Sequence, residues 1–401
     1  MNGISLLYIL MFERETIMKH KSIILAIILI SINTIVCGQS EITGVSIGAS
    51  ELELKWENWA TNYILEYNSS LMNTDWEYCG DVLSTNSSFI NEDVCQGFYR
   101  IRKVRVLEFP DDIFRQAIID CIPSKFKPND QIYDIDNIGS VSILNLRTAE
   151  GAYISNTDGI EYLSNLAVIR MSSDFATSLN FQPEPMRELY ISSMHSLTNL
   201  NVHGSTNLYY LDFAYCPNIT HIDLSTNPKL RYLQCSYSGL TSLDLSSNWL
   251  RSIDAANCYL TNIVGLSGQY SRYIILNDNE LSGTLDVSHC SQLDFILCGN
   301  NNLTDLILDD TPVTIVDCRN NSITNISMVG LATNALGWSI IERFYCQNNR
   351  LSGTLDLSNM VSLQYLYARN NQLSEIILPQ RPPYLDVDDD VVITIAGVPW
   401  P

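Results

Sequence analysis

The sequence predicts a mainly β fold. We expect a solenoid of stacked repeats with a parallel β-sheet, a short helical cap at its N-terminal end, and a small antiparallel β-sandwich before the cap. Three observations predict this fold. A unit of about 21 residues recurs over the C-terminal half, alternating apolar and polar residues occupy 41–106, and an amphipathic segment joins the two regions. Repeats are considered first because they override the usual relation between chain length and domain number.

The composition indicates a folded, acidic protein. Apolar residues make up 46% of the 401 residues, which is enough for a packed core. The 23 lysines and arginines against 44 aspartates and glutamates give a net charge of −21. A surface for DNA or RNA needs clustered positive charge, so nucleic acid is excluded as an expected partner.

The first 38 residues have the layout of a signal peptide. The basic segment 18–21 precedes the uncharged run 22–36, whose 15 residues fall short of the roughly 20 that span a membrane. We expect Met18 to be the true start and cleavage to follow Gly38, giving a secreted or cell-surface protein that does not span the membrane. Lipid attachment through Cys37 and an uncleaved anchor are the alternatives.

Residues 40–106 are expected to form a small β-sandwich, because 51–56, 63–67 and 98–102 alternate with a period of two. The string LELKWENWATNYILEYNSSLMNTDWEY, with its later FYRIR, resembles the fibronectin-III-like module of secreted proteins from environmental bacteria. In an exported domain of this size, a disulfide between Cys79 and Cys95 is the simplest assignment, and two separate buried thiols are the alternative. Such a module implies a spacer or scaffold.

A helical cap is expected over 107–135. Asp111 or Asp112 can serve near the N-cap, and an apolar stripe follows at Ile113, Phe114, Ala117 and Ile118. The first repeat of a solenoid would otherwise expose its core. The strings FPDDIFRQAI and NTDGIEYLSNLAVIRM resemble the cap and first repeats of internalin-like proteins.

The solenoid itself is expected over 136–378, with a C-terminal cap over 379–401. Steps of 22, 20, 21, 22, 20, 28 and 22 residues separate the units, which begin at Leu208, Leu230, Leu250, Ser271, Leu293, Val313, Ile341 and Leu363. Each unit continues L-x-x-L-x-[LC]-x-x-[NC]-x-L, and its second half reads L-x-x-L-D-L-S in the clearest cases. The longest step holds an insertion near 332–338. This pattern resembles the 21-residue bacterial class of leucine-rich repeats.

The physical reason for the pattern is that one unit cannot bury its apolar residues alone, whereas stacked units bury each other's. Counting the first residue of each unit as position 1, the L-x-x-L-x-L segment is a strand whose positions 4 and 6 point inward. Asn at position 9 turns the chain, and its amide can bond backbone groups that the strand leaves free. Cys216 and Cys258 replace this asparagine in two units.

The cysteines at position 6 are expected to be core residues rather than metal ligands or redox groups. Cys235, Cys298, Cys318 and Cys346 take places that Phe, Ala and Leu occupy elsewhere. A buried column is poorly shaped for a metal. Pairing among Cys216, Cys258 and Cys290 stays open. The acidic run 386–390 is expected to be a solvated turn and not a calcium loop, so neither a metal nor a cofactor is predicted.

The candidate binding residues are those at positions 3 and 5, which project from the concave side of the sheet. They form a surface rich in tyrosine and aspartate, suited to protein anchors or to stacking on sugar rings. Its members are Tyr190, Tyr210, Asp212, Tyr232, Gln234, Asp254, Tyr273, Phe295, Asp317, Arg343, Tyr345, Tyr365 and Tyr367. The alternative is that these tyrosines only pack along the ladder.

The expected function is that of a monomeric, exported, non-enzymatic interaction protein that contacts a protein or a cell surface. The alternative is a carbohydrate-binding accessory protein that uses the tyrosine stripe. An enzyme on a solenoid is a weaker third possibility, because Arg343 is almost the only basic residue among the candidate positions.

Overall fold

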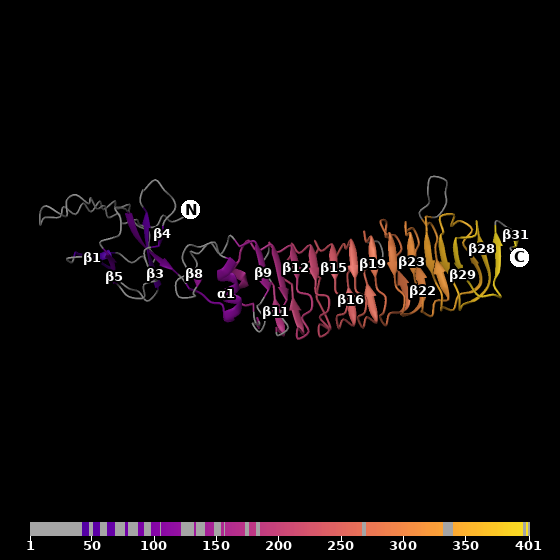
Figure 1. Ribbon diagram of the computed structural model, residues 1–401, viewed down its shortest axis with the longest axis horizontal. Coiled ribbons are helices and arrows are strands. Elements are labelled where there is room, and N and C mark those ends of the chain that lie inside the picture. Colours follow the sequence, from indigo (N-terminus) through magenta and orange to yellow (C-terminus); the bar gives the residue numbers. More distant parts are fainter. Residues whose placement is uncertain are drawn as a thin grey trace. The chain divides into compact units, whose positions relative to one another are not determined.

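In the computed structural model the repeats form coils that follow one another along the chain (Figure 1). Chain contacts divide the protein into two units, residues 1–108 with 119–138, and residues 109–118 with 139–401. The structure describes the strands between 42 and 104 by their backbone. It also describes residues 106–121, 132–133, 141–147, 154–155, 157–172, 176–181, 185–266, 270–331, 340–395 and 398–399. The expected signal peptide, Cys37, the Cys79–Cys95 disulfide and the insertion near 332–338 lie outside these ranges.

The first unit contains two three-stranded antiparallel sheets. One has the order β1-β2-β5 and the other β4-β3-β6. Their bounds are β1 Ile42–Ile47, β2 Glu51–Trp56, β3 Asn62–Asn68, β4 Glu77–Tyr78, β5 Ser87–Asn91 and β6 Phe98–Val104. The short strands β7 (Val106–Leu107) and β8 (Ile132–Tyr133) also pair antiparallel. Three of these strands, β2, β3 and β6, fall where the period-two pattern predicts them.

The α-helix α1 (Asp112–Cys121) begins at an aspartate cap, and a short 3-10 helix follows at Ile160–Tyr162. Asp111 is the N-cap, because its carboxylate accepts the backbone N–H of Phe114 at 2.7 Å. The same carboxylate accepts the backbone N–H and the hydroxyl of Ser155, both at 2.7 Å, which ties the helix to the first coils. Phe114 and Ile118 are fully buried, as the apolar stripe predicts. Among the described residues no helix is long and apolar enough to cross a membrane.

The main sheet has twelve parallel strands, and most are three residues long. In chain order they are β9 (Ile143–Arg147), β10 (Val168–Ser172), β12 (Glu188–Tyr190), β14 (Tyr210–Asp212), β15 (Tyr232–Gln234), β17 (Ser252–Asp254), β19 (Tyr273–Ile275), β21 (Phe295–Leu297), β23 (Ile315–Asp317), β25 (Arg343–Tyr345), β27 (Tyr365–Tyr367) and β29 (Tyr384–Asp386). The fold is therefore the expected leucine-rich-repeat solenoid. The pairing of β29 with β27 continues the sheet into the segment for which a cap is expected.

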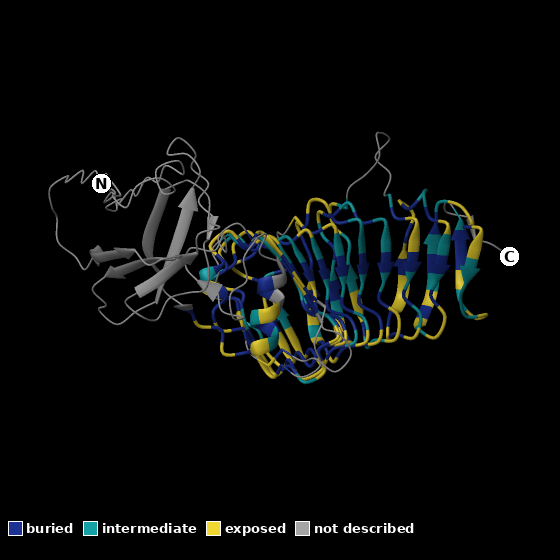
Figure 2. Cartoon of the chain, turned by 60° about the vertical axis from the view of Figure 1, so that its left-hand side comes forward, coloured by how far each residue is buried: buried dark blue, intermediate teal, exposed yellow. Residues whose placement is uncertain are grey.

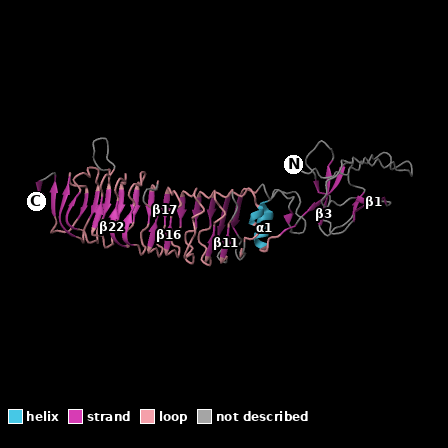
Figure 3. Cartoon of the chain, turned by 180° about the vertical axis from the view of Figure 1, so that it is seen from behind, coloured by secondary structure: helices cyan, strands magenta, loops and turns pink. Residues whose placement is uncertain are grey.

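The second halves of the coils form shorter sheets, whose strands β11, β16 and β22 lie below the main-sheet strands in Figure 3. The parallel pairings are β11 (Ser178–Asn180) with β13 (Asn199–Asn201), β16 (Ser242–Asp244) with β18 (Asn262–Val264), the set β20 (Ser282–Asp286), β22 (Asn302–Ile307) and β24 (Asn325–Ser327), and the set β26 (Ser352–Asp356), β28 (Gln372–Leu378) and β30 (Val392–Ile395). The last strand, β31 (Val398–Pro399), pairs antiparallel with β30.

The apolar repeat positions form one continuous core between these faces (Figure 2). Leu233, Ile296 and Leu366 are completely buried, and Leu243 on a second-half strand is 2% exposed. Each buried leucine or isoleucine contributes about 1.5–3 kcal/mol through removal from water. The prediction that neighbouring coils bury each other's leucines is confirmed.

The cysteines belong to this core. Among the residues whose side chains the structure describes, seven cysteines are buried and form no disulfide: Cys216, Cys235, Cys258, Cys290, Cys298, Cys318 and Cys346. The open possibility of pairing among Cys216, Cys258 and Cys290 is therefore not realised. Burial raises the pKa of Cys346 to about 12 and that of Cys216 to about 11, so these thiols stay protonated at neutral pH.

The turn after each main strand uses two neighbouring positions, where the sequence pattern predicted one. The left-handed residue is at position 8, with φ near +57° at Tyr237, Asn300 and Asn348. Asn at position 9 makes the expected backbone bonds. The Asn301 amide donates to the carbonyls of Leu276 and Cys298, and its oxygen accepts the Leu281 N–H, all at 3.0 Å. Position 8 favours Asn because its short polar side chain tolerates the left-handed conformation.

Candidate functional site

The candidate residues lie on the outer face of the twelve-stranded sheet. In most three-residue strands the middle residue is buried and the two flanking residues are at least partly exposed. Parallel register places position 3 of one coil beside position 3 of the next, as with Tyr210 and Tyr232, and position 5 beside position 5. We call these two rows the strand face. All thirteen predicted residues belong to it.

The aromatic rings of the strand face pack against one another from coil to coil. Tyr190 contacts Tyr210 with ring centroids 4.7 Å apart, and Tyr210 contacts Tyr232 at 6.1 Å. Further along, Tyr273 and Phe295 stack at 4.7 Å. Near the C-terminal end, Tyr345 contacts Tyr367 at 5.3 Å, and Tyr365 stacks on Tyr384 at 4.4 Å with ring planes 2° apart.

This packing follows from the spacing of parallel strands, about 4.8 Å, which is close to the distance between stacked rings. Ring faces are therefore turned toward neighbouring coils. The hydroxyl of Tyr210 donates to the side-chain oxygen of Gln234 at 2.9 Å. Burial raises the pKa of Tyr210 to about 12, so this hydroxyl remains a neutral donor. The guanidinium of Arg343 lies 5.2 Å from the ring centre of Tyr365.

The aspartates of the strand face have a structural role in the turns. The carboxylates of Asp212, Asp254 and Asp317 each accept the backbone N–H two residues ahead, at 3.0, 3.3 and 3.3 Å. Burial raises the pKa of all three carboxyl groups. These aspartates therefore close the turn that follows the strand, the role that short acidic side chains take in Asx turns. The tyrosines are the better candidates for contact with a ligand.

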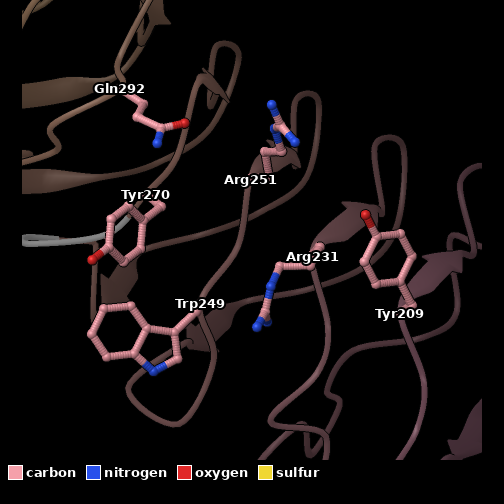
Figure 4. A pocket seen from close by; sticks show the side chains of 6 residues that line it. All are labelled: Tyr209, Arg231, Trp249, Arg251, Tyr270 and Gln292. Atoms are coloured by element: carbon pink, nitrogen blue, oxygen red, sulfur yellow. The ribbon is translucent and has the colours of Figure 1, made fainter.

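Sequence reasoning missed a groove at the edge of the sheet where the strands begin (Figure 4). We call it the edge groove, and it has a volume of about 590 Å³. Its lining residues are Tyr209, Arg231, Trp249, Arg251, Tyr270 and Gln292. They occupy position 2 of one coil or the place just before position 1. The available signal was the column of arginines at position 2, which appears only when the units are aligned coil by coil.

The described part of the chain contains no group of three or more His, Cys, Asp or Glu side chains that could hold a metal ion. In the acidic run near the C-terminus, Asp386 pairs with the Arg369 guanidinium at 2.9 Å, and Asp388 accepts the backbone N–H of Asn370 at 2.8 Å. These two carboxylates thus tie the last described coils together.

No protein-family model matches the chain. Protein BRASSINOSTEROID INSENSITIVE 1 of Arabidopsis thaliana is 27% identical in an alignment of 220 positions that covers 49% of this chain. The chain spans only 18% of the length of that relative.

Two of the similar solved structures are from Listeria monocytogenes. The functional domain of InlJ, which includes a cysteine ladder, is 19% identical and matches 68% of this chain and 76% of its own, with a TM-score of 0.38. An internalin, InlF, is 18% identical and matches 70% of this chain and 92% of its own, with a TM-score of 0.35.

Proposed function

We propose that this chain is an exported, non-enzymatic interaction protein that binds a protein partner, on a cell surface or in solution, through its strand face. The observation that supports this most is the set of aromatic rings that contact one another between neighbouring coils, with centroids 4.4–6.1 Å apart. Rings that are ordered before binding lose little conformational freedom on contact, and tyrosine is enriched where binding energy concentrates.

The charged groups of the same face support binding rather than catalysis. Its aspartates are engaged in turns, and Arg343 lies against Tyr365. A hydrolytic or lyase site would need an acid and a base converging on one point of a cleft. The strand face offers instead a row of amphipathic side chains spread over many coils, the kind of surface that solenoids present to large partners.

Carbohydrate binding through the same tyrosines is the alternative. Stacking on a pyranose requires an accessible ring face. In Tyr365 and Tyr384 the stacked arrangement turns one face of each ring toward the other, and the Tyr190–Tyr210–Tyr232 row is packed similarly. Ring edges and hydroxyls are then what a ligand meets. This geometry favours a protein surface over a sugar.

The test is binding of the labelled full-length protein to intact cells. Tyr365→Ala with Tyr367→Ala should abolish binding, whereas Tyr259→Ala, an equally bulky tyrosine that is 59% exposed outside the strand face, should not. Protease treatment of the cells should remove the binding and periodate oxidation of their glycans should not. The reverse result would favour the carbohydrate alternative, and equal binding by all variants would refute the role of the strand face. Export predicts that N-terminal sequencing of the secreted protein begins at Gln39.

A further inference from the structure

The edge groove combines positive charge with exposed aromatic rings in a chain whose net charge is −21. Position 2 is arginine in four of the five consecutive coils that begin at residues 186, 208, 230, 250 and 271, namely Arg187, Arg231, Arg251 and Arg272, with Tyr209 in the remaining coil. Backbone bonds place three of them in successive coils, because the Arg251 N–H donates to the Arg231 carbonyl at 2.7 Å and the Arg272 N–H to the Arg251 carbonyl at 2.8 Å.

These stacked positive charges are only partly balanced. Arg272 pairs with Asp294 at 3.3 Å, at the place where position 2 changes from basic to acidic. Arg231 bonds carbonyls of its own coil, those of Leu230 at 2.8 Å and Pro228 at 3.1 Å. Within the described ranges no carboxylate forms an ion pair with Arg231 or Arg251. Arg231 and Arg251 therefore add two positive charges at this groove without a carboxylate partner in the described ranges, which favours an anionic ligand there.

The rings of the edge groove are unusually exposed. Trp249 is 50% exposed, Tyr270 53% and Tyr209 43%. The rings of Trp249 and Tyr270 lie 5.5 Å apart and are tilted by 35°. In Figure 4 they stand side by side at one end of the groove, and the two guanidinium groups extend to opposite sides. Exposed tryptophan and tyrosine next to arginine is the combination that dominates the binding energy of protein interfaces.

We infer that the edge groove binds an acidic segment of a protein partner, with carboxylates on Arg231 and Arg251 and an apolar side chain on Trp249 and Tyr270. Guanidinium groups recognise carboxylates through paired hydrogen bonds, which favours aspartate and glutamate. The tilted rings provide no single flat platform for a pyranose, so a peptide fits better than an acidic sugar. Elsewhere the acidic surface repels such a segment, and charge complementarity therefore selects this groove. The inference rests on the proposed function only in taking the ligand to be a protein.

The experiment uses the full chain and a fluorescein-labelled peptide of six glutamates preceded by one leucine, followed by fluorescence anisotropy. We expect binding that weakens as salt is added, and at least about tenfold weaker binding for the double variant Arg231→Gln with Arg251→Gln. The controls are Arg350→Gln with Arg369→Gln, which removes the same charge from exposed arginines of later coils, and Arg350→Gln alone, which leaves the ion pair of Arg369 with Asp386 in place. Trp249→Ala should also weaken binding. Circular dichroism of every variant confirms the fold.

Three results would overturn the inference: no binding by the unmodified protein, equal loss in the control variant, or tighter binding of oligogalacturonate, an acidic sugar, than of the peptide. A peptide of six glutamines tests whether the carboxylates are needed. Tyr365→Ala with Tyr367→Ala should bind the acidic peptide normally. If that variant also leaves cell binding unchanged, the proposed role of the strand face fails while the edge groove stands, so the two failures are distinguishable.

Discussion

Replacement of the buried Asn301 by alanine would test how the solenoid holds its turns. The residue Asn301 is 8% exposed, and its side chain bonds groups of two neighbouring coils. Its oxygen accepts the N–H of Leu281, and its amide donates to the carbonyls of Leu276 and Cys298, each at 3.0 Å. Alanine cannot replace any of these bonds.

The three groups that bond Asn301 do not all lose their last hydrogen bond in Asn301→Ala, and this difference sets the expected loss of unfolding free energy. The Leu276 carbonyl keeps a bond from the Asn279 amide at 3.0 Å, and the Cys298 carbonyl keeps one from Asn321 at 3.0 Å. The buried Leu281 N–H loses its side-chain acceptor. A buried donor left without a partner costs about 1–3 kcal/mol, and each lost bond to a carbonyl that keeps another costs less. The expected loss of unfolding free energy is about 3 kcal/mol.

The assay is equilibrium unfolding in urea, combined with native-state hydrogen exchange at the Leu281 amide. Asn302→Ala is the matched control, because it makes the same chemical change at the exposed neighbouring residue. Solenoids need not unfold in one step, so exchange gives the local free energy where the urea transition does not. If the two variants differ by less than about 0.5 kcal/mol, or if the Leu281 amide keeps its protection in Asn301→Ala, the asparagine bonds do not stabilise the turn.

Three further predictions concern the helix cap, the thiols and the buried acids. In a thermal scan, Asp111→Ala should destabilise the protein by about 2 kcal/mol, because it removes the N-cap bond and both bonds to Ser155. Asp112→Ala is the control: it loses only an exposed ion pair with Arg115 and should cost less than about 1 kcal/mol. Cys346 should resist iodoacetamide at pH 8 in the folded protein and react in urea, because burial raises its pKa to about 12. Mass spectrometry of the peptide that contains Cys346 measures this, and its alkylation in the folded protein would contradict the prediction. Asp254→Asn should stabilise the protein more at pH 7 than near pH 4. Burial raises the pKa of Asp254 in the folded state, so the stability that the protonated carboxyl group contributes is full below the unfolded pKa and is lost as pH rises through the folded pKa. Urea midpoints of both proteins at the two pH values measure this, and the same difference at both pH values would exclude it.

The fold could be predicted because its determinants repeat. Leu233, Ile296 and Leu366 occupy equivalent places in their units, and their burial follows from the period alone. The position of Cys298 and Cys346 in the core follows in the same way, since phenylalanine, alanine and leucine take that place in other units. The bonding role of Asn301 is also predictable. Its left-handed neighbour Asn300 is not, because the pattern shows that a turn occurs and does not show which of two adjacent residues adopts φ > 0.

The contacts of the candidate binding residues could be predicted less completely, because contact between coils depends on register rather than on period. The alternation of strands places Tyr365 on the outer face, but only the pairing of β27 with β29 shows that its ring stacks on Tyr384. Asp254 appears as a surface acid in the sequence, whereas its bond to the backbone of Ala256 makes it part of a turn. The edge groove required the residues before position 1 and at position 2 to be compared between coils.

In a stack of repeats, the residues at one position of successive coils form a column. The types of side chain in such a column indicate whether it contributes to the stability of the fold. At position 8, Tyr215 and Tyr237 stack at 4.7 Å, and farther along the same column Asn320 donates to Asn300 at 2.6 Å and Asn370 to Asn348 at 2.7 Å. Both arrangements stabilise the column, because each side chain contacts its counterpart one coil away, through ring stacking or through a hydrogen bond. Position 2 differs, because Arg231 and Arg251 carry like charges on successive coils and, within the described ranges, only Arg272 of the four arginines forms an ion pair along the column, with Asp294 at 3.3 Å. Such a column is therefore better explained by a ligand than by the fold, and this reasoning locates the edge groove independently of its shape.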